Sequence, residues 1–144
     1  MKIFVLAILA VLAAAACGGE TSAPPPTPSI DFTMDAQNGS GASGTGTVVK
    51  GAGSFTVTIQ LTGLAPNSSH VSHVHAGGCG APGGITFALQ QVIADSAGAA
   101  TMATTVPAGY LVPTSGWYVN VHHGPDFSAP ANAPSDSCGD LPAA

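Results

Sequence analysis

Hydrophobic and polar residues alternate along most of the chain beyond the first 29 positions. The clearest case is the run 55–62, where Phe55, Val57, Ile59 and Leu61 alternate with threonine and glutamine. A period of two directs one set of side chains toward a core and the other toward water, as in an antiparallel sheet. Comparable patterns predict further strands within the ranges 30–34, 47–50, 69–80, 83–89, 100–106 and 116–123.

Turn-forming residues separate these predicted strands. Residues 38–46 are rich in glycine and are expected to be flexible, and everything after Gly124 is expected to form loops. Residues 90–94 could continue a strand or form a helical turn. About seven short strands with turns between them predict one all-β domain over residues 30–144, built as an antiparallel sandwich or barrel.

The first 29 residues predict export and attachment to a membrane. Lys2 precedes an apolar run that ends at Ala16, and this run is shorter than the roughly 20 residues of a membrane-spanning helix. Small residues before Cys17 resemble a bacterial lipobox, with Ala14 where the best match has leucine. Residues 1–16 are therefore expected to be a lipoprotein signal peptide, Cys17 to carry acyl chains, and residues 17–29 to form a proline-rich tether. The alternative is an ordinary secreted protein cut near the same alanines.

Charge narrows the possible partners. Once the leader is removed, Lys50 is the one basic residue left against seven acidic residues, and the sequence contains no arginine. A nucleic-acid partner is not expected, because phosphate binding needs clustered lysine and arginine. The lack of a basic patch leaves the lipid as the means of attachment to the cell envelope, outside the cytoplasm. A protein partner stays unknown.

Five histidines are the main candidates for chemistry. His73 and His75 lie two apart on a predicted strand and therefore share a face, while Val74 faces the other way. In the run 116–123, Trp117, Val119 and Val121 form the apolar face, so Asn120 and His122 lie opposite. If the two strands are neighbours, His73, His75 and His122 converge on the outward face of the sheet.

Three neutral imidazoles on a rigid sheet predict a copper site, with Cu(II) favoured on affinity and zinc as the alternative. His70 and His123 are candidate extra ligands, Asp126 is a weaker one, and Asn120 could orient an imidazole. The competing interpretation is that the histidines bond to loop carbonyls and stabilise corners without a metal.

Cys79 and Cys138 remain as a possible pair if Cys17 is lipidated. They are 59 positions apart in a compartment that permits disulfides, and a bridge would stabilise the fold by roughly 4 kcal/mol in a chain-entropy model. The alternative is that two free thiols join a metal site. We expect the disulfide.

Several motifs together resemble the CHRD domain, named after chordin. They are Leu61-Thr62-Gly63-Leu64, His73-Val74-His75-Ala76-Gly77 and Tyr118-Val119-Asn120-Val121-His122. The resemblance covers roughly residues 30–141 and implies an antiparallel Greek-key β-sandwich of immunoglobulin-like character, with about seven to eight strands. It carries the family's histidines to His73, His75 and His122. The usual closing strand of the family is missing here, where residues 133–140 stand instead.

The chain also resembles copper/zinc superoxide dismutase in part. His73 and His75, then Cys79, then Cys138-Gly139 match that family's features in order. A zinc-loop histidine cluster and the arginine that attracts superoxide are missing from the sequence. Three functions therefore stay open: a metal-binding module, a structural or interaction domain, and a dismutase-like copper oxidoreductase. An enzyme is the least expected of the three.

Overall fold

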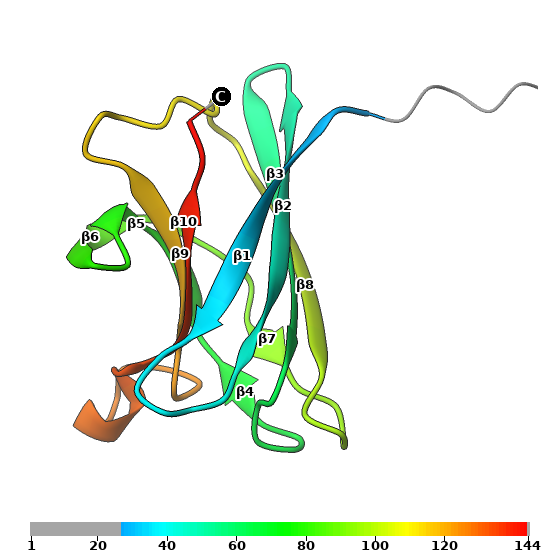
Figure 1. Ribbon diagram of the computed structural model, residues 1–144, viewed down its shortest axis with the longest axis vertical. Helices are drawn as coiled ribbons and strands as arrows, with labels where there is room; N and C mark the ends of the chain where they lie inside the picture. Colours follow the sequence, from blue (N-terminus) through cyan, green and yellow to red (C-terminus); the bar gives the residue numbers. More distant parts are fainter. Residues whose placement is uncertain (1–26, 144) are drawn as a thin grey trace, which may run out of the picture.

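Residues 27–143 are described by a computed structural model, and their strands pair throughout in antiparallel fashion (Figure 1). Eight strands form one sheet in the order β6-β5-β9-β10-β1-β2-β3-β8, and β4 and β7 form a small second sheet. The strands are β1 (Ser29–Ala36), β2 (Ser43–Gly51), β3 (Ser54–Thr62), β4 (Ser69–His70), β5 (Ser72–Gly78), β6 (Ala81–Ala88), β7 (Val92–Ile93), β8 (Ala100–Val106), β9 (Trp117–His122) and β10 (Ser135–Leu141). One 3-10 turn, η1 (Pro130–Asn132), lies between β9 and β10.

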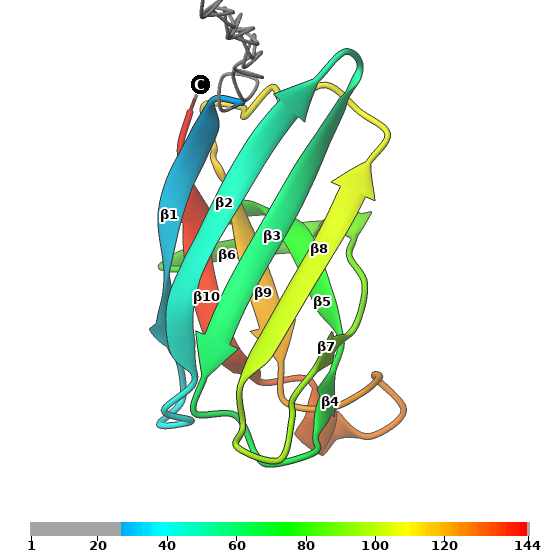
Figure 2. The ribbon, with the colours of Figure 1, turned by 90° about the vertical axis from the view of Figure 1, so that its right-hand side faces the viewer.

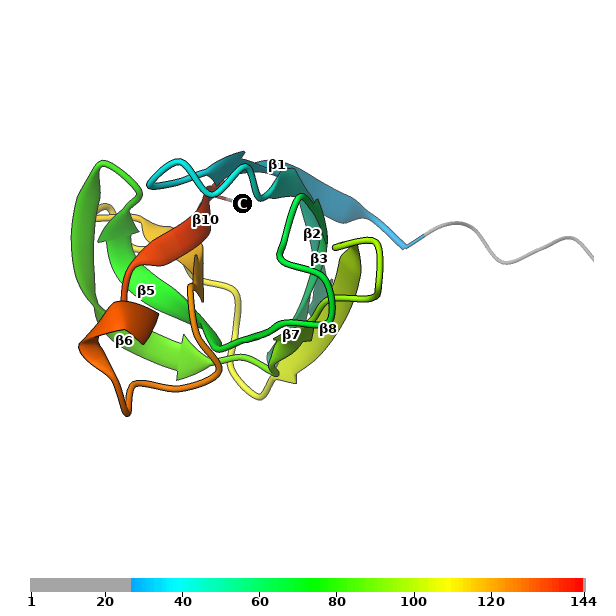
Figure 3. The same cartoon turned by 90° about the horizontal axis from the view of Figure 1, so that it is seen from below.

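The large sheet curls so that its two halves face each other. Strands β1, β2, β3 and β8 make one half and β6, β5, β9 and β10 make the other, as Figures 2 and 3 show from two directions. The halves join where β1 pairs with β10, with Asp35 opposite Cys138 and Ala36 opposite Ser137. Because the chain crosses between halves three times, after β3, after β6 and after β8, sequence neighbours are separated in the sheet. This arrangement confirms the predicted all-β antiparallel fold.

The core fills the space between the two halves. In β3 the alternate residues Phe55, Val57, Ile59 and Leu61 are buried, as their period predicts. Phe55 stacks on Trp117 of β9 with ring centroids 6.0 Å apart. From the opposite half, β5 and β9 contribute core residues that are completely buried, including Val74, Val119 and Val121. Each large apolar side chain buried in this way stabilises the fold by roughly 1.5–3 kcal/mol.

The prediction that only loops follow Gly124 is wrong, because β10 lies in the middle of the large sheet between β9 and β1. Its sequence, Ser-Asp-Ser-Cys-Gly-Asp-Leu, has no run of alternating apolar residues. The strand fits because small residues allow close approach. A Cβ atom on Gly139 would lie 2.3 Å from the carbonyl oxygen of Thr33 and 2.7 Å from the sulfur of Met34.

The glycine-rich residues 38–46 are also more ordered than their composition predicts. Strand β2 begins at Ser43 and includes Gly44 and Gly46. Gly46 pairs with Phe32 of β1, and a Cβ atom there would lie 2.1 Å from the phenyl ring. The glycine makes room for an aromatic side chain rather than for a turn. Residues 90–94, which could have been strand or helical turn, contain the two-residue strand β7.

Cys79 and Cys138 form the predicted disulfide, with Cα atoms 5.9 Å apart. The bond connects the chain just after β5 to the central strand β10. The backbone N–H of Cys79 also donates to the carboxylate of Asp140, which lies on β10 like Cys138, at 2.7 Å. A disulfide of this kind indicates a protein outside the cytoplasm.

The predictions for the N-terminus fall outside the described part of the chain. They are the signal peptide of residues 1–16, the lipidation of Cys17 and most of the proline-rich tether. Among residues 27–143, no helix has the length and apolar character needed to cross a membrane.

Candidate metal centre

His73, His75 and His122 are brought together by the pairing of β5 with β9. His73 lies opposite Asn120 and His75 lies opposite Tyr118, while Val74 faces the core with Val119. His122 lies two residues beyond Asn120 and so shares its face. One ring nitrogen from each histidine can be chosen so that all three lie within 4.8 Å of one another. The three histidines therefore converge where β5 pairs with β9, as predicted.

The three histidines lie on the outer face of their half of the sheet, as predicted, and they are buried there: His73 is 7% exposed, His75 8% and His122 6%. The segment 123–134 folds back near them, and Figure 1 draws it in orange beyond the lower ends of β9 and β10. Phe127 of this segment stacks on His73, with centroids 5.6 Å apart and an interplanar angle of 15°. Its ring also meets His122 in an edge contact at 4.8 Å.

Backbone carbonyls orient two of the three imidazoles. Nδ1–H of His75 donates to the carbonyl of Gly83 at 3.0 Å, and Nδ1–H of His122 donates to the carbonyl of Ala133 at 2.8 Å. A neutral imidazole that donates from one nitrogen keeps a lone pair on the other. Both rings therefore present Nε2 as a possible ligand atom, held by the kind of outer contact that supports metal-bound histidines.

Two nitrogen atoms in the cluster lack any hydrogen-bond partner. Within residues 27–143, Nδ1 of His73 and Nε2 of His75 are the buried side-chain polar atoms in this condition. Leaving a buried acceptor unsatisfied costs about 1–3 kcal/mol. A cation that accepts these lone pairs would remove that penalty, so the donor set fits a metal ion.

Asn120 contacts the cluster, as expected, and its side-chain amide is hydrogen-bonded to His122. Its side-chain N–H donates to Nε2 of His122 at 3.2 Å, and its oxygen accepts a hydrogen bond from the hydroxyl of Ser135. The amide thus occupies the lone pair that a metal would use. Metal binding at His122 requires this amide to turn away.

Burial lowers the pKa of His73 and of His122, which favours their uncharged form near neutral pH. Desolvation, followed by the proximity of His122 and His75, lowers the pKa of His73 from 6.5 to about 4. Desolvation also lowers the pKa of His122, against a smaller raising effect of its hydrogen bond to Ala133. Tyr118 stacks on His75 at 5.0 Å, and burial raises the pKa of its hydroxyl. Neutral imidazole is the form that binds metals.

His70 and His123 do not join the cluster. His70 is 2% exposed; its Nδ1–H donates to the backbone carbonyl of His122 at 2.9 Å, and its Nε2 lies 2.7 Å from the hydroxyl of Ser68. Asp136 of β10 lies between the two histidines, 3.5 Å from Nδ1 of His70 and 3.0 Å from Nδ1 of His123. We call His70, His123 and Asp136 the Asp136 network. It braces the segment that follows β9.

The carboxylate of Asp126, the weaker candidate ligand, is used within its own loop. It accepts hydrogen bonds from the N–H and hydroxyl of Ser128, which lower its pKa, and a longer one from Asn132. Sequence reasoning missed Phe127, Asp136 and the carbonyl of Ala133, since all three act through a loop and a strand that no periodicity marks. Tyr118 lies on the same face as Asn120 and His122, as the alternation along this strand predicts.

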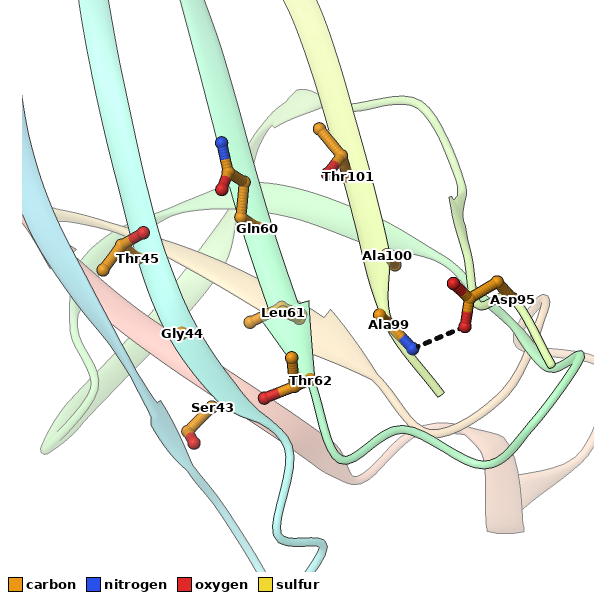
Figure 4. A pocket seen from close by; sticks show the side chains of 10 residues that line it. All are labelled: Ser43, Gly44, Thr45, Gln60, Leu61, Thr62, Asp95, Ala99, Ala100 and Thr101. Atoms are coloured by element: carbon orange, nitrogen blue, oxygen red, sulfur yellow. Dashed lines mark hydrogen bonds between the residues drawn. The ribbon is translucent and has the colours of Figure 1, made fainter. Parts of the chain in front are cut away.

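Two cavities of the described residues lie away from the histidine cluster. One of about 390 Å³ sits over β2, β3 and β8 and is lined by Thr45, Gln60, Thr101 and Asp95, among others (Figure 4). A larger one of about 660 Å³ is bordered by the Asp136 network. Neither cavity is lined by His73, His75 or His122.

Residues 21–125 match the CHRD domain, and this segment contains all three clustered histidines. The chain belongs to the CHRD domain family. Its structure is similar to that of a superoxide dismutase-like protein from Bacillus subtilis, with a TM-score of 0.61 and 14% sequence identity. The similarity covers 78% of this chain and 97% of that one. No match was found among curated protein sequences.

Both resemblances seen in the sequence are thus confirmed at the level of family and fold. The CHRD match ends before β10, so the strand that sequence reasoning missed lies beyond it. At 14% identity, the likeness to the dismutase-like protein shows a shared fold and nothing about activity.

Proposed function

We propose that this CHRD domain binds a copper ion through His73, His75 and His122, with zinc as the second candidate metal. One observation carries the proposal: two buried imidazole nitrogens in the same cluster have no hydrogen-bond partner. Three neutral imidazoles suit both metals, and copper binds such sites more tightly than zinc does. The bound ion would be stored, buffered or passed on.

The proposed setting is the bacterial cell envelope. The disulfide supports an extracytoplasmic location, and the residues around Cys17 support a lipid anchor. The protein would then present its metal site at a membrane surface, on a short proline-rich tether. A dismutase reaction is not included, because the structural similarity extends to the fold alone.

The competing function is a structural domain whose histidines only brace loops. Thermal unfolding of the metal-free protein, with and without added Cu(I) under anaerobic conditions, Cu(II) or Zn(II), separates the two. A ligand that binds only the folded state stabilises it by about 2.7 kcal/mol at 100 times its dissociation constant. The structural alternative predicts the same melting temperature under all conditions.

Two variants make the test specific. His75→Ala removes a clustered donor and should abolish the metal-dependent rise in melting temperature. His123→Ala is the matched control, because His123 is 63% exposed and lies outside the cluster. A wild-type protein that gains no stability from either metal, or an equal gain in His75→Ala, would overturn the proposal.

A further inference from the structure

The donor set carries no negative charge. No carboxylate or thiolate of residues 27–143 joins the three histidines. The acidic residues that flank the site in sequence make other contacts: Asp126 with Ser128, Asp136 with His123, and Asp140 with the backbone of Cys79. An ion held by the cluster would therefore keep its full formal charge.

The surroundings of the cluster are also poorly solvated. Aromatic rings pack on it from two sides, Phe127 against His73 and His122, and Tyr118 against His75. Val74 and Val119 of the core lie on the other face of the same strands. Water is therefore largely kept from the space in which an ion would sit, and compensation of its charge by solvent is weak.

Because of these two features, the charge of an ion determines how much its transfer from water to the site costs. The Born cost of taking an ion out of water grows with the square of its charge, so a divalent ion costs roughly four times as much as a monovalent one of similar size. Imidazole is a ligand for both copper and zinc, so the donor type alone does not determine the charge of the bound ion. Zinc sites also take four ligands as a rule, and the fourth is commonly a water or a carboxylate.

We infer that the cluster of His73, His75 and His122, uncharged and covered by Phe127, selects monovalent over divalent metal ions and holds copper as Cu(I). The inference rests on the proposed metal-binding function and specifies the charge of the ion that the site takes. Phe127 is the selectivity-determining residue, since its apolar ring lies where a charged or hydrated group would otherwise compensate a divalent ion.

The test uses Ag(I) as a monovalent ion that air does not oxidise, compared with Zn(II), on the purified protein in chloride-free buffer. Cu(I) under anaerobic conditions is compared with Cu(II) in a second series. Melting temperature and equilibrium dialysis both report binding. We expect Ag(I) and Cu(I) to bind the wild-type protein at least about 100-fold more tightly than Zn(II), because the divalent ion bears the larger desolvation penalty.

Substitution of Phe127 tests whether its apolar ring causes the preference for monovalent ions. Phe127 is 48% exposed in a loop, so its replacement should leave the fold intact. In Phe127→Glu, the new carboxylate attracts a divalent ion twice as strongly as a monovalent one, and the preference for Ag(I) over Zn(II) should fall by about tenfold or more. Phe127→Leu keeps the site apolar and is the control, with the preference retained.

The possible outcomes separate this inference from the proposed function. If Zn(II) binds as tightly as Ag(I), and His75→Ala abolishes both, the site is a metal site without charge selection and the inference is overturned. An unchanged preference in Phe127→Glu also overturns it. If none of the four ions raises the melting temperature, the proposed function itself fails, and the inference fails with it.

Discussion

Two groups of histidines lie close together in this protein and differ in how their ring nitrogens are used. In the Asp136 network, His70 contacts the carbonyl of His122, the hydroxyl of Ser68 and the carboxylate of Asp136. In the cluster on β5 and β9, His73 and His75 each bury a nitrogen that contacts no hydrogen-bonding group. His70 is as deeply buried as the clustered histidines, so burial does not distinguish a candidate ligand from a brace. The unpaired nitrogens of His73 and His75 do.

The difference predicts that His70→Leu and His73→Leu change the stability of the metal-free protein in opposite directions. His70→Leu removes the donor to the buried carbonyl of His122 and the partner of Asp136 and Ser68. We expect the free energy of unfolding to fall by about 2–4 kcal/mol, because buried polar groups are left unpaired. Urea denaturation at pH 7.5 with a chelator present measures it. A loss below about 1 kcal/mol would mean that the network does not stabilise the fold.

Lowering the pH should affect the metal-free protein through the cluster. The pKa of His73 is about 4 in the folded protein and near 6.5 when unfolded, so the unfolded state binds the proton first as the pH falls. The stability associated with neutral His73 is present above pH 6.5 and is lost between pH 6.5 and about 4. The loss is at most about 3 kcal/mol, and smaller where solvent screens the charge. Urea denaturation at several pH values measures it.

His73→Leu provides the control for this pH dependence. The variant lacks the titrating group, so its stability should fall less between pH 6.5 and 4 than that of the wild type. Equal slopes in the two proteins would assign the pH dependence to other groups. NMR titration of the wild type should then show His73 titrating near its ordinary pKa.

At pH 7.5 the same variant should behave differently from His70→Leu. Replacing His73 removes a buried nitrogen that has no partner, and it breaks no hydrogen bond that involves this side chain. We expect the metal-free protein to keep its stability or to gain about 1 kcal/mol, since an apolar group no longer leaves an acceptor unsatisfied. Urea denaturation of the two leucine variants side by side measures the contrast. A loss as large as that of His70→Leu would show that the cluster is a structural element.

The contrast between these groups could be predicted from the sequence only in part. Period two placed His73, His75 and Asn120 on one face and Val74 on the other, and the pairing of β5 with β9 completed the cluster. Strand β3 and the pairing of Cys79 with Cys138 were also predicted correctly. All of these depend on local alternation or on a small set of possible partners.

The elements that escaped prediction depend on contacts between distant residues. Strand β10 consists of small and polar residues, and it is a strand because β1 and β9 bond to it on both sides. Asp136 on that strand determines that His70 is a brace, and Phe127 and Ala133 in the preceding loop determine that the clustered histidines are buried and oriented. Alternation along the chain cannot reveal where a loop folds back, so it placed the histidines on the outward face of the sheet without showing that a loop covers them.

The smallest expected effect concerns Asn120 in the cluster on β5 and β9. Its amide gives His122 a hydrogen bond that a metal would have to displace. Asn120→Ala removes this competitor and leaves Nε2 of His122 unpaired in the metal-free protein. A neutral hydrogen bond contributes about 0.5–1.5 kcal/mol, so we expect affinity for copper to rise by roughly twofold to tenfold. Equilibrium dialysis with a competing chelator measures the change, and Ser135→Ala, which frees the other end of the amide, should produce a smaller rise. A fall in affinity for Asn120→Ala would instead mean that the amide orients His122 for the metal, and the hydrogen bond would then support the site rather than compete with it.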